Sequence, residues 1–141
     1  MMISERKLVS ETEDYFQEMK FNTVREVPLF ENRIDLVVHD RRFSKIIAVE
    51  VKVDKWFRAL QQAVLYRICA DRVYVALSEV FVHRVDLRLM EKYGVGLLSV
   101  NGSLNEILPP DPSKYVTHQK ARNGVRRSLV EARGWGHVKE V

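Results

Sequence analysis

The sequence predicts an α/β domain in which a mixed β-sheet is flanked by helices. Three features indicate this class: an amphipathic N-terminal helix, two apolar strands joined by a short polar loop, and an apolar helix followed by another strand. The chain has 141 residues, of which 46% are hydrophobic and 30% charged, which suits one domain with a substantial core. We expect this domain to occupy residues 1–111 and a basic helical extension to occupy residues 112–141.

The N-terminal helix is expected to run from Ser4 to about Lys20. Ser4 is a good N-cap, because its hydroxyl can accept a hydrogen bond from a free amide of the first turn. One stripe of the helix is apolar and should face the sheet; it consists of Leu8, Val9, Thr12, Tyr15, Phe16 and Met19. Glu5 falls in the middle of this stripe. It either favours the helix dipole as an acid of the first turn or belongs to a site on the buried face.

Three strands are expected to follow, over residues 23–27, 33–39 and 45–53. The first of them should end at Pro28. Residues 40–45 are expected to form a hairpin loop between the second and the third. The third strand is apolar almost throughout, which is typical of a strand buried on both faces. We therefore expect it to lie inside the sheet.

The hairpin is expected to bring three charged side chains together. If it closes symmetrically about Arg42 and Phe43, Asp35 lies directly opposite Glu50, with the Cβ atoms about 5 Å apart. Period-2 alternation puts Lys52 on the same face. Two carboxylates this close would leave one protonated unless a cation lies between them, and hard oxygens with water are how Mg²⁺ is usually held. The alternatives are a structural Glu50–Lys52 pair or a strand end that reaches solvent.

A second helix is expected over residues 55–70, with Asp54 as its N-cap. It is apolar nearly all round, as a helix packed against a sheet should be. Its polar exceptions share one narrow stripe and are Lys55, Arg58, Gln62 and Tyr66. Tyr66 can also be explained as an ordinary core residue.

Three further strands and a helix are expected to complete the domain: strands over residues 72–78, 95–100 and 104–108, and a helix over residues 80–93 that ends at Gly94. Asn101-Gly102 predicts a tight turn between the last two strands. No arrangement of residues in this region indicates chemistry.

The C-terminal extension carries the whole excess of positive charge. Residues 1–111 contain 16 basic and 17 acidic residues, whereas residues 112–141 contain 7 and 2. A helix is expected from Tyr115 to about Ala132, and its basic residues include Lys120, Arg122, Arg126 and Arg127. Such a helix can follow a phosphate backbone and add salt-sensitive affinity for nucleic acid. It can equally be a solvated helix that packs on the domain through its apolar residues.

Asp35, followed on the next strand by Glu50-Val51-Lys52, resembles the motif of the PD-(D/E)XK nuclease superfamily. Ile34 stands where the nominal motif has proline, which is its loosest position. The resemblance implies a restriction-endonuclease-like αβββαβ core with a mixed central sheet.

A second element supports the resemblance. Gln62-x-x-x-Tyr66 begins ten residues after Lys52 and resembles the QxxxY element of RecB-type members of the superfamily. Many members also keep an extra active-site carboxylate on the first helix, where Glu5 lies. The resemblance covers roughly residues 4–100 and leaves the C-terminal extension unexplained.

The resemblance implies metal-dependent hydrolysis of phosphodiester bonds in nucleic acid, with DNA as the favoured substrate. The groups that would hold Mg²⁺ or Mn²⁺ are Asp35, Glu50, Glu5 and the Val51 carbonyl. Lys52 would activate water or, more safely, stabilise developing negative charge, and Gln62 would complete the catalytic set. The residues that would contact the substrate backbone are Lys55, Arg58 and Tyr66.

Other classes of function fit less well. A non-catalytic nucleic-acid-binding or complex-assembly module on the same fold is the alternative, but loss of an acid or of the lysine would mark it, and all three are present. No nucleophile–base pair or cofactor motif indicates a metabolic enzyme. The single cysteine, Cys69, excludes an intramolecular disulfide and fits a cytoplasmic setting, and no segment approaches transmembrane length. Because so small a domain has little surface for specificity, a homodimer or a partner subunit is a reasonable expectation.

Overall fold

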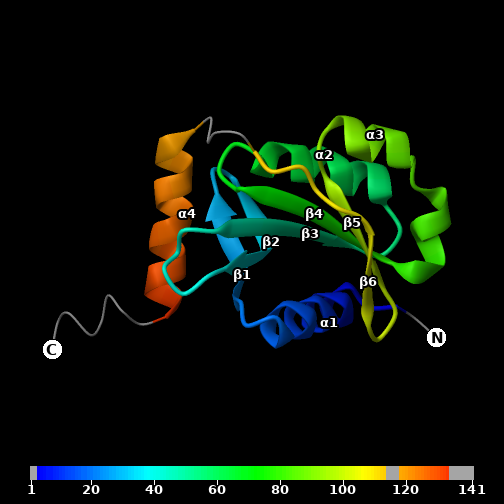
Figure 1. Ribbon diagram of the computed structural model, residues 1–141, viewed down its shortest axis with the longest axis horizontal. Helices are drawn as coiled ribbons and strands as arrows, with labels where there is room; N and C mark the ends of the chain where they lie inside the picture. Colours follow the sequence, from blue (N-terminus) through cyan, green and yellow to red (C-terminus); the bar gives the residue numbers. More distant parts are fainter. Residues whose placement is uncertain (1–2, 114–117, 134–141) are drawn as a thin grey trace, which may run out of the picture.

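The computed structural model describes residues 3–113 and 118–133, which form a six-stranded mixed sheet with helices on both faces (Figure 1). The strands follow one another across the sheet in chain order. They are β1 (Asn22–Leu29), β2 (Asn32–His39), β3 (Ile46–Lys52), β4 (Arg72–Ser78), β5 (Gly96–Val100) and β6 (Leu104–Leu108). The helices are α1 (Glu5–Glu18), α2 (Trp56–Tyr66), α3 (Leu87–Lys92) and α4 (Gln119–Ala132), with a 3₁₀-helix η1 (Glu79–Arg84).

β3 lies where the sheet changes from antiparallel to parallel pairing. It pairs antiparallel with β2 and parallel with β4, and β4 pairs parallel with β5. The β2–β3 register runs from Leu36↔Val49 to His39↔Ile46, which is the closure about Arg42 and Phe43 that the sequence predicts. That prediction is confirmed.

The side chains of β3 alternate between two hydrophobic cores. Ile46 and Ala48 belong to the core that also contains buried residues of α2, whereas Ile47, Val49 and Val51 belong to the core that packs against α1. In Figure 1, α1 lies on one side of the sheet and α2 on the other. The predicted division of the strand into two faces is therefore confirmed.

Three elements differ from the expectation. β1 continues past Pro28, which an edge strand tolerates because proline lacks only a donor. α2 is shorter than predicted, and its N-cap is Lys55 rather than Asp54. The predicted helix over residues 80–93 is broken at Val85, which is extended, so that η1 precedes α3. Asp86 caps α3 by accepting a hydrogen bond from the Leu89 amide, a local bond that competes with a continuous helix.

α4 packs against the sheet. Its buried residues Ala121, Val125 and Leu129 share a core with Val27 and Leu29 of β1. Residues before and after the predicted boundary at residue 111 thus share one core in the described part of the chain. The predicted start of this helix falls on residues 115–117, which lie outside the described residues. Within the described residues, no helix has the length and apolar character needed to cross a membrane.

Candidate active site

Two carboxyl groups face each other across the β2–β3 pair. Extending the observed register by one residue beyond Leu36↔Val49 places Asp35 alongside Glu50. Glu50 is buried, with 4% of its surface exposed, and Asp35 is half-buried. The backbone amide of Val51 donates a hydrogen bond of 2.9 Å to Asp35 Oδ2, which fixes this carboxyl against β3. The predicted convergence of the two acids is thus present in the fold.

Tyr66 holds the buried Glu50. Its hydroxyl donates to Glu50 Oε1 at 2.5 Å and lies 3.3 Å from the carbonyl oxygen of Arg33. Only 1% of Tyr66 is exposed, and both burial and the neighbouring Glu50 charge raise the pKa of its phenol. The expectation that Tyr66 contacts nucleic acid is therefore not met, because the ring is in the core and its hydroxyl is engaged.

The carboxyl pair holds protons more tightly than isolated acids do. Burial, and next the Asp35 charge, raise the pKa of Glu50 to about 8, although Tyr66 and Lys52 act in the opposite direction. Burial also raises the pKa of Asp35, against the lowering effect of the Val51 amide. At neutral pH the pair therefore retains a proton.

Lys52 lies at the end of β3, between the carboxyl pair and α1. Its Nζ is 3.4 Å from Glu5 Oε1 and 3.8 Å from Glu50 Oε2. The Lys52 side chain is 28% exposed and that of Glu5 48%, so solvent reaches this side of the site. Glu5, in the first turn of α1, is thus placed against the lysine.

The donor set of Asp35 and Glu50 fits a hard divalent cation. Both supply carboxylate oxygens, which Mg²⁺ prefers, and a cation would remove the repulsion that raises the pKa of Glu50. The described residues contain no group of three or more His, Cys, Asp or Glu side chains arranged to hold a metal. A metal at this pair would therefore take its other ligands from backbone carbonyls and water.

The other predicted residues in and next to α2 differ in how far they are buried. Gln62 is half-buried, one turn before Tyr66, whereas Lys55 and Arg58 are exposed near the start of the helix. Lys55 and Arg58 are thus free to meet solvent or ligand.

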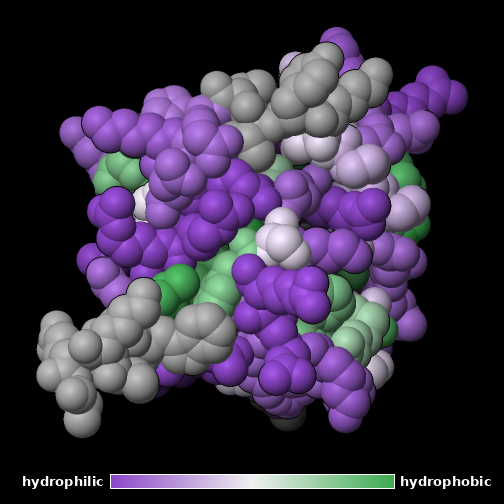
Figure 2. Space-filling view, turned by 60° about the vertical axis from the view of Figure 1, so that its left-hand side comes forward, coloured by the Kyte–Doolittle hydropathy of each residue, from purple (hydrophilic) through white to green (hydrophobic). Residues whose placement is uncertain are grey.

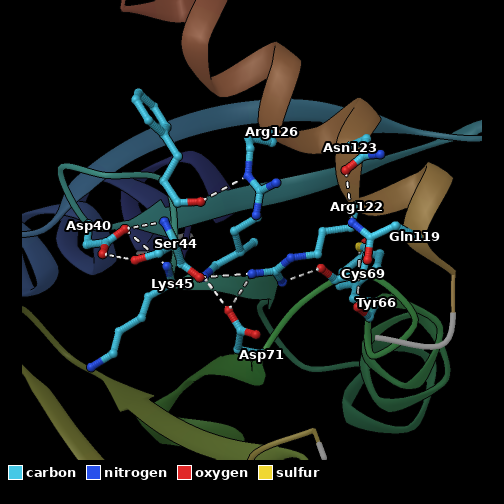
Figure 3. A network of polar contacts seen from close by, with 12 residues as sticks. Asp40, Ser44, Lys45, Tyr66, Cys69, Asp71, Gln119, Arg122, Asn123 and Arg126 are labelled. Atoms are coloured by element: carbon cyan, nitrogen blue, oxygen red, sulfur yellow. Dashed lines mark hydrogen bonds and ion pairs between the residues drawn. The ribbon is translucent and has the colours of Figure 1, made fainter. Parts of the chain in front are cut away.

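The basic residues of α4 divide into two groups. Lys120 and Arg127 are exposed, but Arg122 is 6% exposed and donates to the carbonyls of Cys69 and Ser44 and to Asp71 (Figure 3). A phosphate contact by Arg122 is therefore not compatible with this structure, because its guanidinium is buried and already bonded. Arg126 is half-buried and donates Nε to the Phe43 carbonyl at 3.1 Å.

The sequence reasoning missed that Tyr66 orients Glu50. The available signal was the alternation of β3, which points Glu50 towards the face that α2 covers. A tyrosine on the buried side of that helix then has a carboxyl group within reach. It also missed Asp71, the partner of Arg122, for which we find no signal in the sequence.

Comparison with known proteins concerns the fold. No protein-family model matches the chain, and no curated protein matches it. A solved protein of unknown function from Silicibacter pomeroyi, SPO1766, is 17% identical with a TM-score of 0.71, and the match covers 99% of this chain and 94% of that one. A repair endonuclease from Pyrococcus abyssi is 18% identical with a TM-score of 0.51, and the match covers 72% of this chain.

The chain spans about half of that endonuclease, 49% of its length. SfsA from Pyrococcus furiosus, solved in complex with Ca²⁺, gives a TM-score of 0.48 at 13% identity over 78% of this chain and 65% of that one. At these identities the likeness is one of fold. The mixed α/β sheet with flanking helices is consistent with a nuclease-like fold.

Proposed function

We propose that this chain is a metal-dependent phosphodiesterase that cleaves nucleic acid, with DNA as the favoured substrate. The observation that carries the proposal is the Asp35–Glu50 pair, in which two carboxyl groups face each other beside a single ammonium, that of Lys52, where solvent has access. A structural ion pair would need only one acid for the lysine. Two facing acids instead match the donor set of a divalent cation.

Asp35, Glu50 and the Val51 carbonyl would hold Mg²⁺ or Mn²⁺. When bound, such an ion acidifies a water molecule and offsets the negative charge of a phosphate. Asp35 is fixed by the Val51 amide and Glu50 by Tyr66, so both carboxyls are already oriented. Preorganised groups lose little freedom when the ligand arrives.

Lys52 would stabilise the negative charge that develops on the phosphoryl oxygens. Its Nζ is held on one side by Glu5 and on the other by Glu50, which keeps the ammonium at the solvent side of the pair. Because two carboxyl groups lie within 4 Å of its Nζ, we assign Lys52 the role of a cation rather than that of a base. Gln62 would contact the substrate or a water molecule, and Lys55 and Arg58 would meet its backbone.

The test is cleavage of plasmid, duplex, single-stranded DNA, branched DNA and RNA with Mg²⁺ or Mn²⁺. Asp35→Asn, Glu50→Gln and Lys52→Met should each abolish cleavage. Glu91→Gln and Lys92→Met make the same chemical changes at exposed positions of α3 and should leave it intact. If Asp35→Asn and Lys52→Met still cleave, the activity belongs to another site or to a contaminant, and the proposal is refuted.

Metal binding gives a readout that does not depend on activity. Mn²⁺ should raise the thermal midpoint of the wild type but not that of Asp35→Asn or Glu50→Gln. If metal binds and no substrate is cut, while nucleic acid is still retained, the chain is a binding module on this fold. That module is the second candidate.

A further inference from the structure

A second group of cations lies at the opposite end of β3 from the candidate active site. Residues 40–45 form the loop between β2 and β3, and α4 packs beside them. We call the basic part of this region the loop–helix surface; it consists of the exposed Arg41, Arg42 and Lys45 and the half-buried Arg126. Lys45 and Lys52 lie at the two ends of β3, so their backbones are about 23 Å apart at 3.3 Å per strand residue.

The loop is held in one conformation by its own polar contacts. Asp40 accepts hydrogen bonds from the backbone amides of Ser44 and Lys45, at 2.8 and 3.0 Å. Phe43, at φ 57°, is buried and stacks on the ring of His39. In Figure 3 the Asp40 side chain turns towards Ser44, whereas the Lys45 side chain extends away from the network. The loop's acid is therefore turned inward and its lysine outward.

α4 is bonded to this loop. Arg126 donates Nε to the carbonyl of Phe43, and Arg122 donates to the carbonyl of Ser44 at 2.9 Å. The bond to Phe43 uses Nε and leaves the Nη groups of Arg126 directed elsewhere. The backbone of the loop is thus fixed against the helix, so the loop backbone loses little conformational entropy when a ligand binds.

Positive charge is concentrated here. Residues 40–45 and 118–133 contain 8 of the 23 basic residues of the chain and only 2 of its 19 acidic ones. One of those acids is Asp40, which the loop uses internally. The other is Glu131, which lies about 140° around the helix from Arg126 at 100° per residue. Figure 2, in which the α4 side is turned forward, shows a largely hydrophilic face.

We propose that the loop–helix surface binds the phosphate backbone of nucleic acid at a point separate from the reacting phosphate. The choice of partner rests on the proposed function. Cations on a loop that exposes no apolar side chain suit a polyphosphate, whereas a membrane-binding loop would present an aromatic or leucine side chain for insertion. The aromatic residue of this loop, Phe43, is buried. A distance of about 23 Å corresponds to roughly seven base-pair steps of a duplex.

The experiment measures binding of a labelled 30-base-pair duplex to the whole chain in EDTA, as a function of salt. Arg41→Gln with Arg42→Gln removes two exposed charges from the surface. Arg88→Gln with Lys92→Gln removes two from α3 and serves as the control. With about 0.9 ions released per phosphate contact, the loop variant should lower the salt slope by about 1.8. Its loss of affinity between 50 and 200 mM salt should be roughly tenfold smaller than that of the wild type.

If the loop variant and the wild type have the same salt slope, the inference is overturned. It is also overturned if the control variant on α3 lowers the salt slope as much as the loop variant does. Binding to vesicles of phosphatidylserine and phosphatidylcholine tests a membrane as the alternative partner. Binding to them that depends on Arg41 and Arg42, without such dependence for the duplex, would also overturn it.

Cleavage distinguishes this inference from the proposed function. In an active enzyme the loop variant should raise KM for long duplex, leave kcat unchanged and leave hydrolysis of bis(p-nitrophenyl) phosphate unchanged. Because binding is measured in EDTA, an inactive wild type that still shows the altered slope would refute the nuclease proposal alone. An active enzyme with an unaltered slope would refute the loop–helix surface alone.

Discussion

Replacing Arg122 by methionine removes the main polar attachment of α4 to the loops that precede β3 and β4. The guanidinium is 6% exposed and donates to Cys69 O at 3.0 Å, Ser44 O at 2.9 Å and Asp71 Oδ2 at 3.1 Å. Removing one partner of a buried ion pair costs about 3–5 kcal/mol. The Asp71 side chain is 37% exposed and also accepts from the Ile46 amide, so it can be rehydrated. We therefore expect a loss of about 3 kcal/mol in the free energy of unfolding, at the lower end of that range.

Urea unfolding followed by circular dichroism measures this loss, and the thermal midpoint should fall by roughly 10 °C for a chain of this size. Arg127→Met, on the exposed side of the same helix, is the matched control and should change stability by less than about 0.5 kcal/mol. Arg122→Lys keeps the charge but loses the fork geometry, so it should lie between the two. Equal stability of Arg122→Met and Arg127→Met would refute the reasoning, because it would mean that the buried hydrogen bonds do not hold the helix.

Three further predictions concern the core and the carboxyl pair. Because the pKa of Glu50 is raised to about 8 from 4.5, its contribution to stability is complete below about pH 4.5 and is lost as the pH rises through 8. The urea midpoint of Glu50→Gln should therefore depend less on pH between 5 and 9 than that of the wild type. At pH 9 the variant should be more stable than the wild type, by at most about 5 kcal/mol. The same pH dependence in both proteins would contradict this. Tyr66→Phe removes the hydroxyl that stabilises ionised Glu50, so it should raise the pKa of Glu50 further, as carboxyl infrared titration would detect; an unchanged titration would mean that the bond is not made. A Cβ on Gly96 would lie 2.8 Å from Pro110 N and from Tyr74 Cδ1, so Gly96→Ala should cost about 1–3 kcal/mol in urea unfolding, whereas Gly124→Ala, with open space around it, should not destabilise the chain.

The candidate site was predictable because its geometry follows from strand alternation and loop length. Period 2 assigns Glu50 to a face of β3, and a loop closing about Arg42 and Phe43 sets Asp35 opposite it. Both signals come from residues close together in the sequence, so they can be interpreted without knowledge of the rest of the fold.

The parts that were wrong depend on contacts distant in sequence. Arg122 reads as a solvated cation on a basic helix, but its partners Ser44, Cys69 and Asp71 lie 51 to 78 residues earlier. Likewise, apolar spacing over residues 80–93 suggested one helix, yet Asp86 caps a new one there. Charge counts and helical periods do not reveal distant partners such as those of Arg122, or side-chain caps such as Asp86 that compete with a continuous helix.

The attachment of α4 has a consequence for synthesis of the protein. The helix is translated after all six strands, yet it covers apolar residues of β1, including Val27 and Leu29, that are made about a hundred residues earlier. Until α4 has left the ribosome, this part of the nascent sheet is exposed to water and to other chains. Ribosome-bound chains arrested before residue 118 should therefore bind a chaperone, and those that extend beyond α4 should not.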